Sequence, residues 1–135
     1  MRVLYENSAT LENESSVASV LEKSWGCRAF KLPISYRVDY ALTVEGKIKS
    51  WTEIKCRGKR YDDMHLSLHK WMAGVELSRR TGLPFVLVYA FNDGIVWRRV
   101  DTDQPELTIG GRTDRGDWQD TEPMATFQLK GFKTL

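Results

Sequence analysis

Residues 36–56 read YRVDYALTVEGKIKSWTEIKC, and this stretch decides the fold that the sequence predicts. Both ends of the stretch are rich in β-branched and aromatic side chains, and the Glu-Gly pair at 45–46 is a turn signal, so we predict a β-hairpin. Side chains alternate between the two faces of a strand. Glu53 and Lys55 therefore share one face, while Ile54 points to the other face, towards a core.

Strand parity makes a specific demand on this hairpin. With a plain two-residue turn at 45–46, Asp39 would lie opposite Thr52 and would point away from Glu53. A three-residue loop, or a β-bulge elsewhere, would place Asp39 directly opposite Glu53, with Cβ atoms roughly 5 Å apart. Two carboxylates at that spacing can share one cation. A metal site here therefore requires an odd-length loop or a bulge.

Such a site has the parts that hydrolysis of a phosphodiester needs, namely an activated water and stabilisation of charge on the phosphate. Mg²⁺ supplies part of both, and it prefers a few carboxylates together with several waters. We expect Asp39, Glu53 and the backbone carbonyl of Ile54 to be the ligands. Lys55 is the candidate for orienting or deprotonating the water, or for neutralising the phosphate. An acid-x-Lys triplet on a strand is more often a solvated face with a weak ion pair.

A helix expected over 11–23 contributes a further acid. Thr10 is the expected N-cap, and apolar side chains recur at helical spacing along this segment. Glu14 lies at the border of the apolar stripe, where it could bind a second metal or hold a water molecule. Glu12 competes for this role, and an ordinary surface charge is the other interpretation of Glu14.

The remaining elements predict a mixed α/β fold in one domain over 1–135, in which helices cover a mixed β-sheet. Its core spans about 11–100, and 101–135 is expected to be a polar tail with one edge strand at 125–129. The other expected elements are strands at 28–32, 36–44, 47–56, 84–91 and 95–100 and a helix at 63–80.

The overall composition does not indicate a nucleic-acid partner, but the clustering of basic residues does. The formal net charge of the 135 residues is +2, but basic side chains are clustered after the hairpin. The apolar run at 84–91 is far too short to span a membrane, and two cysteines without a C-x-x-C motif fit a reducing cytoplasm. The residues expected to contact nucleic acid are Arg57, Lys59, Arg60, Ser67, His69 and Lys70.

Two alternatives come from other classes of protein. Cys56, His65 and His69 might hold zinc, because the two histidines would lie four residues apart on the expected helix. A nucleic-acid-binding or scaffold protein without catalysis is the second alternative. The set of Asp, Glu and Lys argues against it, since binding alone gives no reason to gather acids near phosphates.

Glu14, Asp39, Glu53 and Lys55, in this order of elements, resemble the PD-(D/E)XK nuclease superfamily. Its members share an αβββαβ restriction-endonuclease-like core with a helix acid, an Asp on the second strand and an acid-x-Lys on the third. One departure is Val38, which replaces the proline that names the motif.

The chain looks most similar to small phage or prophage nucleases and to Holliday-junction resolvases of archaeal type. This resemblance implies a Mg²⁺-dependent DNA endonuclease, with Mn²⁺ as a substitute, in the host cytoplasm. It also implies a role in phage replication or recombination. Branched DNA as the substrate would favour a symmetric homodimer, because two strands must be cut in concert.

Overall fold

The computed structural model describes residues 13–111 and 121–135, and in these ranges it has two α-helices and nine strands in two sheets. In chain order the elements are α1 (Glu14–Trp25), β1 (Arg28–Lys31), the 3-10 turn η3 (Ile34–Tyr36), β2 (Tyr40–Val44), β3 (Lys47–Cys56), β4 (Asp63–Ser67), α2 (Leu68–Thr81), β5 (Phe85–Phe91), β6 (Gly94–Arg99), β7 (Glu106–Gly111), β8 (Thr121–Gln128), η5 (Leu129–Gly131) and β9 (Lys133–Thr134).

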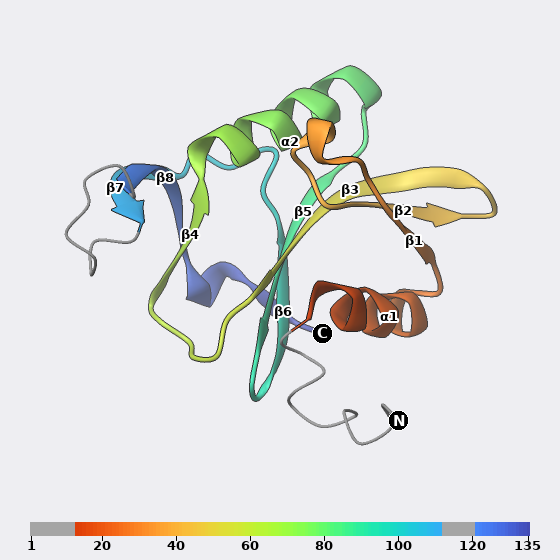
Figure 1. The fold of residues 1–135 in the computed structure, drawn as a ribbon, viewed down its shortest axis with the longest axis horizontal. Helices are drawn as coiled ribbons and strands as arrows, with labels where there is room; N and C mark the ends of the chain where they lie inside the picture. Colours follow the sequence, from red (N-terminus) through yellow and green to blue (C-terminus); the bar gives the residue numbers. More distant parts are fainter. Residues whose placement is uncertain (1–12, 112–120) are drawn as a thin grey trace.

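The main sheet has six strands in the order β1-β2-β3-β5-β6-β9. Only β3 and β5 run parallel; the other neighbours are antiparallel. The connection between the two parallel strands contains β4 and α2. β4 then pairs with β8, and β8 with β7, in a separate antiparallel sheet beside the main one (Figure 1). The expected mixed α/β fold is confirmed.

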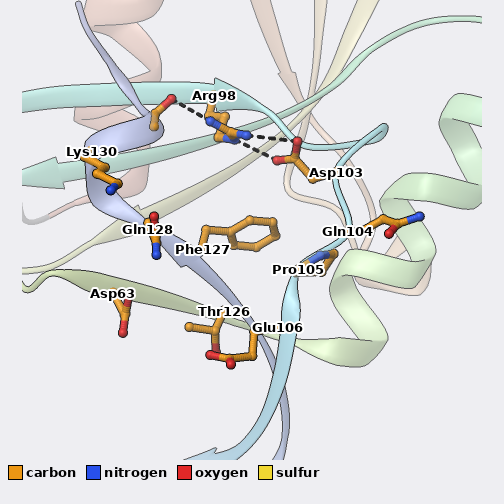
Figure 2. A pocket seen from close by; sticks show the side chains of 11 residues that line it. Asp63, Arg98, Asp103, Gln104, Pro105, Glu106, Thr126, Phe127, Gln128 and Lys130 are labelled. Carbon is orange, nitrogen blue, oxygen red and sulfur yellow. Dashed lines mark hydrogen bonds and ion pairs between the residues drawn. The ribbon is translucent and has the colours of Figure 1, made fainter.

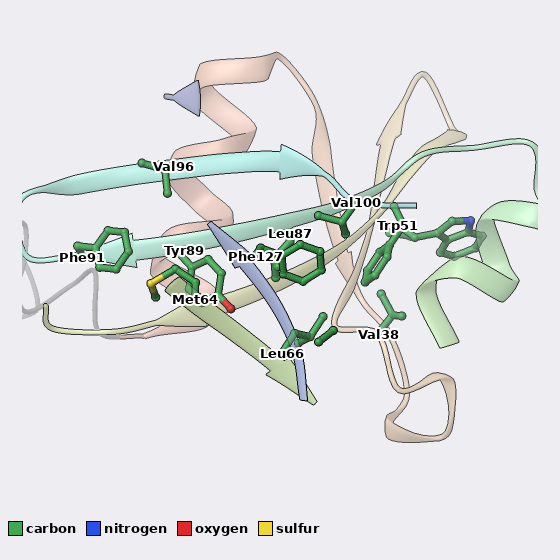
Figure 3. Packing of buried hydrophobic residues seen from close by; sticks show 13 residues of the cluster. Val38, Trp51, Met64, Leu66, Leu87, Tyr89, Phe91, Val96, Val100 and Phe127 are labelled. Atoms are coloured by element: carbon green, nitrogen blue, oxygen red, sulfur yellow. The ribbon is translucent and has the colours of Figure 1, made fainter. Parts of the chain in front are cut away.

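The two faces of the main sheet are covered by different elements. α1 packs its buried residues Val17 and Leu21 against Ile54 of β3 and Val88 of β5. The opposite face packs against α2 and the three-stranded sheet (Figure 3). Alternation along β3 therefore sends Ile54 to the α1 side, as expected, and Glu53 to the α2 side.

α1 begins later than the sequence predicts. Its N-cap is Asn13, whose side chain accepts a hydrogen bond from the Ser15 amide at 2.8 Å. The helix ends at Gly26, which has the left-handed φ of 64° that a glycine adopts without steric cost. The expected N-cap, Thr10, lies outside the described residues.

The helix expected over 63–80 is wrong in its first part, where residues 63–67 form β4. Met64 and Leu66 are buried while Asp63 and His65 are exposed, which is the alternation of a strand. β8 supplies the pairing partner, so a tertiary contact decides the local structure. Apolar spacing after residue 67 is helical, and α2 follows there.

α2 lies close to β5 because it carries a glycine. A Cβ on Gly74 would collide with the ring of Phe85, which is fully buried. Trp71 and Leu77 of α2 also pack against the same core cluster. The helix can therefore approach the sheet closely only with a residue that lacks a side chain at position 74.

Two further expectations need correction. The strand expected over 36–44 starts only at Tyr40, because Ile34–Tyr36 close a 3-10 turn behind Pro33. The 101–135 segment is more than a polar tail with one edge strand. Its β8 lies inside the small sheet, Phe127 packs in the core cluster of Figure 3, and the edge of the main sheet is β9.

The strands expected at 28–32, 84–91 and 95–100 agree with β1, β5 and β6 to within about one residue, and the strand at 47–56 agrees with β3. No helix in the described ranges combines the length and the apolar character needed to cross a membrane.

Candidate active site

The β2–β3 hairpin has the two-residue turn together with a β-bulge. Near the turn Thr43 pairs with Ile48, but the next pair is Leu42 with Ser50. Lys49 is thus the extra residue of the bulge. This shift changes the parity of every position beyond it. The bulge is one of the two arrangements that the sequence requires for a shared metal site, and it is the one the structure contains.

Beyond the bulge, Tyr40 pairs with Thr52, so one further step along both strands places Asp39 opposite Glu53. A hydrogen bond fixes this arrangement, because the Ile54 amide donates to Oδ2 of Asp39 at 3.0 Å. Asp39 is 9% exposed and Glu53 is 0% exposed. Two acids thus lie together at the end of the hairpin, largely shielded from water.

Glu53 is fully buried, and among the described residues only one of its two carboxylate oxygens has a partner. Its Oε2 lies 3.0 Å from Nζ of Lys70 and 3.4 Å from Nζ of Lys55. Its Oε1 is buried and has no hydrogen-bond partner among the described residues. Leaving a buried carboxylate oxygen without a partner is costly, so such an atom calls for a functional explanation.

The pKa shifts follow from the crowding of charges. Burial raises the pKa of Glu53, and the nearby Asp39 raises it further, against the effect of the two lysines. Burial lowers the pKa of Lys55. Burial also opposes the charge on Lys70, but Glu53 outweighs it and the pKa of Lys70 is raised. Lys55 is therefore the lysine of this site that is closest to giving up its proton.

Lys31 of β1 links the helix acid to the pair. Its Nζ lies 2.7 Å from Oε1 of Glu14 and 3.5 Å from Oδ1 of Asp39. Glu14 thus approaches the site through a lysine, at the N-terminal end of α1. The sequence analysis missed Lys31. Lys31 pairs with Tyr40, the residue next to Asp39, so a prediction of the register between β1 and β2 would have placed Lys31 near the site.

The donor set of the described residues has too few side chains for structural zinc. The described residues contain no group of three or more His, Cys, Asp or Glu side chains that could hold a metal. Structural zinc needs about four such ligands, whereas Mg²⁺ takes one or two carboxylates and keeps several waters. Asp39 and the unpartnered oxygen of Glu53 fit the second description.

The structure contradicts the zinc alternative, because Cys56, His65 and His69 form no metal-binding group. His65 lies on β4, and its Nδ1 is 2.9 Å from the hydroxyl of Thr126. His69 lies on α2, with Nδ1 3.7 Å from Glu122. The two histidines are therefore not on one helix, and with Cys56 they form no metal-binding group.

Of the six residues expected to contact nucleic acid, three lie beside the carboxylates. Arg57 lines a groove of about 710 Å³ together with Glu14, Lys31 and Lys55. His69 and Lys70 line a second groove, which reaches Asp39 from the α2 side. Lys70 was expected only as a phosphate contact, and its ion pair with Glu53 makes it part of the site.

The other three lie elsewhere. Arg60 is held by Asp93 at 2.9 Å and packs over the ring of Phe91, so it fastens the β5–β6 turn. Lys59 is exposed in the loop after β3. Ser67 is the N-cap residue of α2 and forms no side-chain capping bond.

A separate pocket of about 460 Å³ lies between the β6–β7 connection and β8 (Figure 2). Its one arginine, Arg98, binds Asp103 through two hydrogen bonds of 2.7 and 3.0 Å and donates a third to the Gly131 carbonyl. Arg98, Asp103 and the Gly131 carbonyl thus bind one another, so the arginine of this pocket has a structural role.

The geometry described so far agrees with two comparisons with known proteins. Over residues 1–135 the chain matches the family described as "Phage putative PDDEXK endonuclease", and it belongs to that family. PD-(D/E)XK nucleases are the class of enzyme that the fold and the carboxylate–lysine site define. No curated protein matches the chain.

Among solved structures, the chain is similar to Hjc of Archaeoglobus fulgidus, a Holliday junction resolvase from an archaeal hyperthermophile. The TM-score is 0.56 at 15% sequence identity, and the match covers 87% of this chain and 86% of that one. At this identity the likeness establishes the fold.

Proposed function

We propose that this protein is a divalent-metal-dependent DNA endonuclease that hydrolyses phosphodiester bonds. The observation that carries the proposal is the buried Glu53, whose Oε1 has no partner in the described structure and which lies opposite Asp39. A structural ion pair would use both oxygens. A carboxylate with one oxygen satisfied by lysines and one left over is arranged to receive a cation.

Asp39, Glu53 and the backbone carbonyl of Ile54 are the proposed ligands of Mg²⁺, and Mn²⁺ is expected to substitute. Glu14 is proposed as a further ligand or as the group that holds a water molecule near the metal. When bound, the metal would stabilise negative charge on the phosphate and lower the pKa of water. The hydrogen bond from the Ile54 amide to Asp39 keeps one ligand in place before any metal arrives.

Lys55 and Lys70 have different proposed roles. Lys55, whose pKa is lowered by burial, can accept a proton from the attacking water or orient it. Lys70 keeps its charge because its pKa is raised beside Glu53. Its charge favours the ionised form of Glu53 against the effect of burial, and it would neutralise the phosphate once a metal shares that carboxylate.

For the substrate we propose DNA, with structure-specific cleavage of branched DNA in phage replication or recombination as the finer hypothesis. The likeness to the fold of an archaeal Holliday junction resolvase supports the finer hypothesis. We propose that Arg57, Lys59, Arg60, Ser67, His69 and Lys70 contact the nucleic acid, and that a homodimer would cut the two strands of a branched substrate.

The test is cleavage of linear, circular and four-way-junction DNA of matched sequence with Mg²⁺, Mn²⁺ or EDTA. Asp39→Ala is measured in parallel to exclude a contaminating nuclease. We expect metal-dependent cutting that the substitution removes, and the preferred substrate separates a resolvase from a general endonuclease. If a correctly folded protein cuts none of the substrates with either metal, a non-catalytic nucleic-acid-binding or scaffold protein replaces this proposal.

A further inference from the structure

A groove of about 610 Å³ lies between the turn η3 and the N-terminal part of α2, because residues of both segments line it. Asp39 and Lys70, both part of the proposed active site, form one of its walls. The groove is therefore continuous with the place where a scissile phosphate would lie. Its volume is in the range of about 300–1,000 Å³ that is common for small-ligand sites.

The apolar residues lining this groove are Ile34, which is open to solvent, Leu32, which is partly buried, and Val38, which is buried. Ile34 is 94% exposed although it lines the groove, and Leu32 and Val38 lie beside it. Tyr36, on the same turn, is 45% exposed. A single exposed isoleucine is common on protein surfaces. Here it differs because a closed turn presents it at the edge of a charged site.

The turn that presents Ile34 is fixed by its own hydrogen bonds. The Tyr36 amide donates to the Pro33 carbonyl and the Arg37 amide to the Ile34 carbonyl, each at 3.0 Å. Arg37 has a φ of 63°, the left-handed region that costs energy for a residue with a side chain. The chain thus maintains a strained conformation to hold Ile34 and Arg37 at this groove.

The charge around the groove is mainly positive. Lys31, Arg37 and Lys70 line it, and Asp39 is the one acid among the lining residues. Within the described part of the chain, Arg37 forms no ion pair. An apolar wall suits the face of a nucleobase, and cations suit the phosphates on either side of it.

A base inside an intact duplex cannot fill such a groove, because it is stacked and paired within the helix. The occupant must be a nucleotide that is already unpaired, as at a branch, a bulge or a flap. We propose that this groove receives one unpaired nucleotide of the strand being cut, with its base against Ile34 and its phosphates on Arg37 and Lys70. This inference rests on the proposed nuclease function and identifies its substrate as DNA with an unpaired nucleotide beside the cleavage site.

The test measures binding separately from cleavage. Three DNAs of the same sequence are compared by fluorescence anisotropy in Ca²⁺: a continuous duplex, the same duplex with one unpaired 2-aminopurine nucleotide, and a four-way junction. The variants are Ile34→Ser and, as a matched control, Ile48→Ser, which changes an exposed isoleucine on the hairpin outside the groove. Ile34 is 94% exposed and Ile48 is 40% exposed, and circular dichroism of each variant establishes that it folds before binding is measured.

We expect the wild type to bind the bulged DNA about tenfold more tightly than the duplex, which is the size expected for burying a small area of apolar surface between a base and Ile34. Ile34→Ser should remove this preference and the change in 2-aminopurine fluorescence without altering duplex binding, and Ile48→Ser should keep both. An equal loss on all three DNAs, or an unchanged preference in Ile34→Ser, overturns the inference. A protein segment that binds stably at this groove and is not displaced by DNA would also overturn the inference.

The same samples transferred to Mg²⁺ separate this inference from the proposed function. If the wild type cleaves DNA but Ile34→Ser leaves the preference for bulged DNA over duplex unchanged, the nucleotide groove is contradicted and the nuclease function is not. If no DNA is cleaved but the preference for bulged DNA still depends on Ile34, the nuclease function is contradicted and the nucleotide groove is supported.

Discussion

Two groups of carboxylates lie at different places in this fold, the buried pair Asp39 and Glu53 and the partly buried pair Asp101 and Asp103, and they differ in whether every oxygen has a partner. Asp101 and Asp103, around the end of β6, use both of their oxygens: Arg99 and the Phe85 amide bind Asp101, and Arg98 binds Asp103 (Figure 2). Glu53 is buried more deeply and leaves Oε1 without a partner in the described structure.

This difference separates a structural role from a functional one. A buried acid whose hydrogen bonds are all made contributes to stability, while an acid with a missing partner costs stability until something binds it. The costly arrangement lies where the family motif lies, beside Asp39 and between two lysines. Our central claim is therefore that Glu53 is held ready for a cation, whereas Asp101 and Asp103 hold the chain together.

The largest effect is expected from removing either acid of the pair. Asp39→Ala and Glu53→Ala should each lower the cleavage rate by a factor on the order of 10³ or more, because a metal ion contributes several kcal/mol of transition-state stabilisation. Glu76→Ala, which changes a half-exposed acid on α2, is the control. Circular dichroism should show that all three variants fold. Substantial activity in either site variant would remove that acid from the mechanism.

Lys55 should have the next largest effect on activity. Lys55→Met keeps the length of the side chain but removes the group that moves or orients a proton. We expect cleavage to fall about 10²-fold or more while metal binding stays within a few fold of the wild type. Lys23→Met, which changes an exposed lysine in the last turn of α1, should cleave normally. An unaltered turnover number in Lys55→Met would exclude this lysine from the chemistry.

On the structural side of the comparison, Asp101→Ala should lower the free energy of unfolding by about 2 kcal/mol. The substitution leaves the Phe85 amide and Arg99 without their shared acceptor. Metal binding and cleavage per folded molecule should not change. Urea denaturation followed by tryptophan fluorescence measures the loss. A loss of activity without a loss of stability would contradict the structural role of Asp101.

A smaller effect should appear as a dependence of stability on pH. Burial favours the neutral form of Asp101, but the hydrogen bonds from Arg99 and Phe85 outweigh it and lower the pKa below the ordinary value of 3.8. The stability that this ionised group contributes is thus fully present above pH 3.8 and is lost as the pH falls through its lower folded value. In unfolding experiments, the difference between wild type and Asp101→Asn should shrink in strong acid. A constant difference down to pH 2 would contradict this explanation.

The sequence predicted that Asp39 and Glu53 can face each other, because strand parity and the Glu-Gly turn restrict what the hairpin can do, while the catalytic role of the two acids stays a prediction. Asp39 and Glu53 could be placed opposite each other only by a bulge or an odd loop, and the bulge at Lys49 was one of the two alternatives. Whether the hairpin adopts the bulge or the odd-length loop depends on how its strands pair with β1 on one side and β5 on the other. The choice is therefore a tertiary effect that no local pattern contains.

The lysines show the limit more clearly. Lys70 was expected at the nucleic acid, yet its ion pair with Glu53 depends on how closely α2 approaches β5, and Gly74 sets that distance. Residues 63–67 were assigned to the same helix because Met64 and Leu68 have helical spacing. Their true partner, β8, is more than fifty residues further along the chain. A contact over that distance decided the misassigned β4, whereas the later starts of β2 and α1 reflect the local turn behind Pro33 and the Asn13 N-cap.

The most direct test of the central claim is titration of the protein with Mn²⁺ or Mg²⁺ by isothermal calorimetry, without DNA. We predict saturable binding in the wild type and in Asp101→Asn, and loss of that binding in Glu53→Gln and Asp39→Asn. Glu53→Gln keeps the shape of the side chain, so a loss there reports the charge and not the packing. Undiminished binding in Glu53→Gln, or no binding in the wild type, would contradict the claim that Glu53 is held ready for a cation.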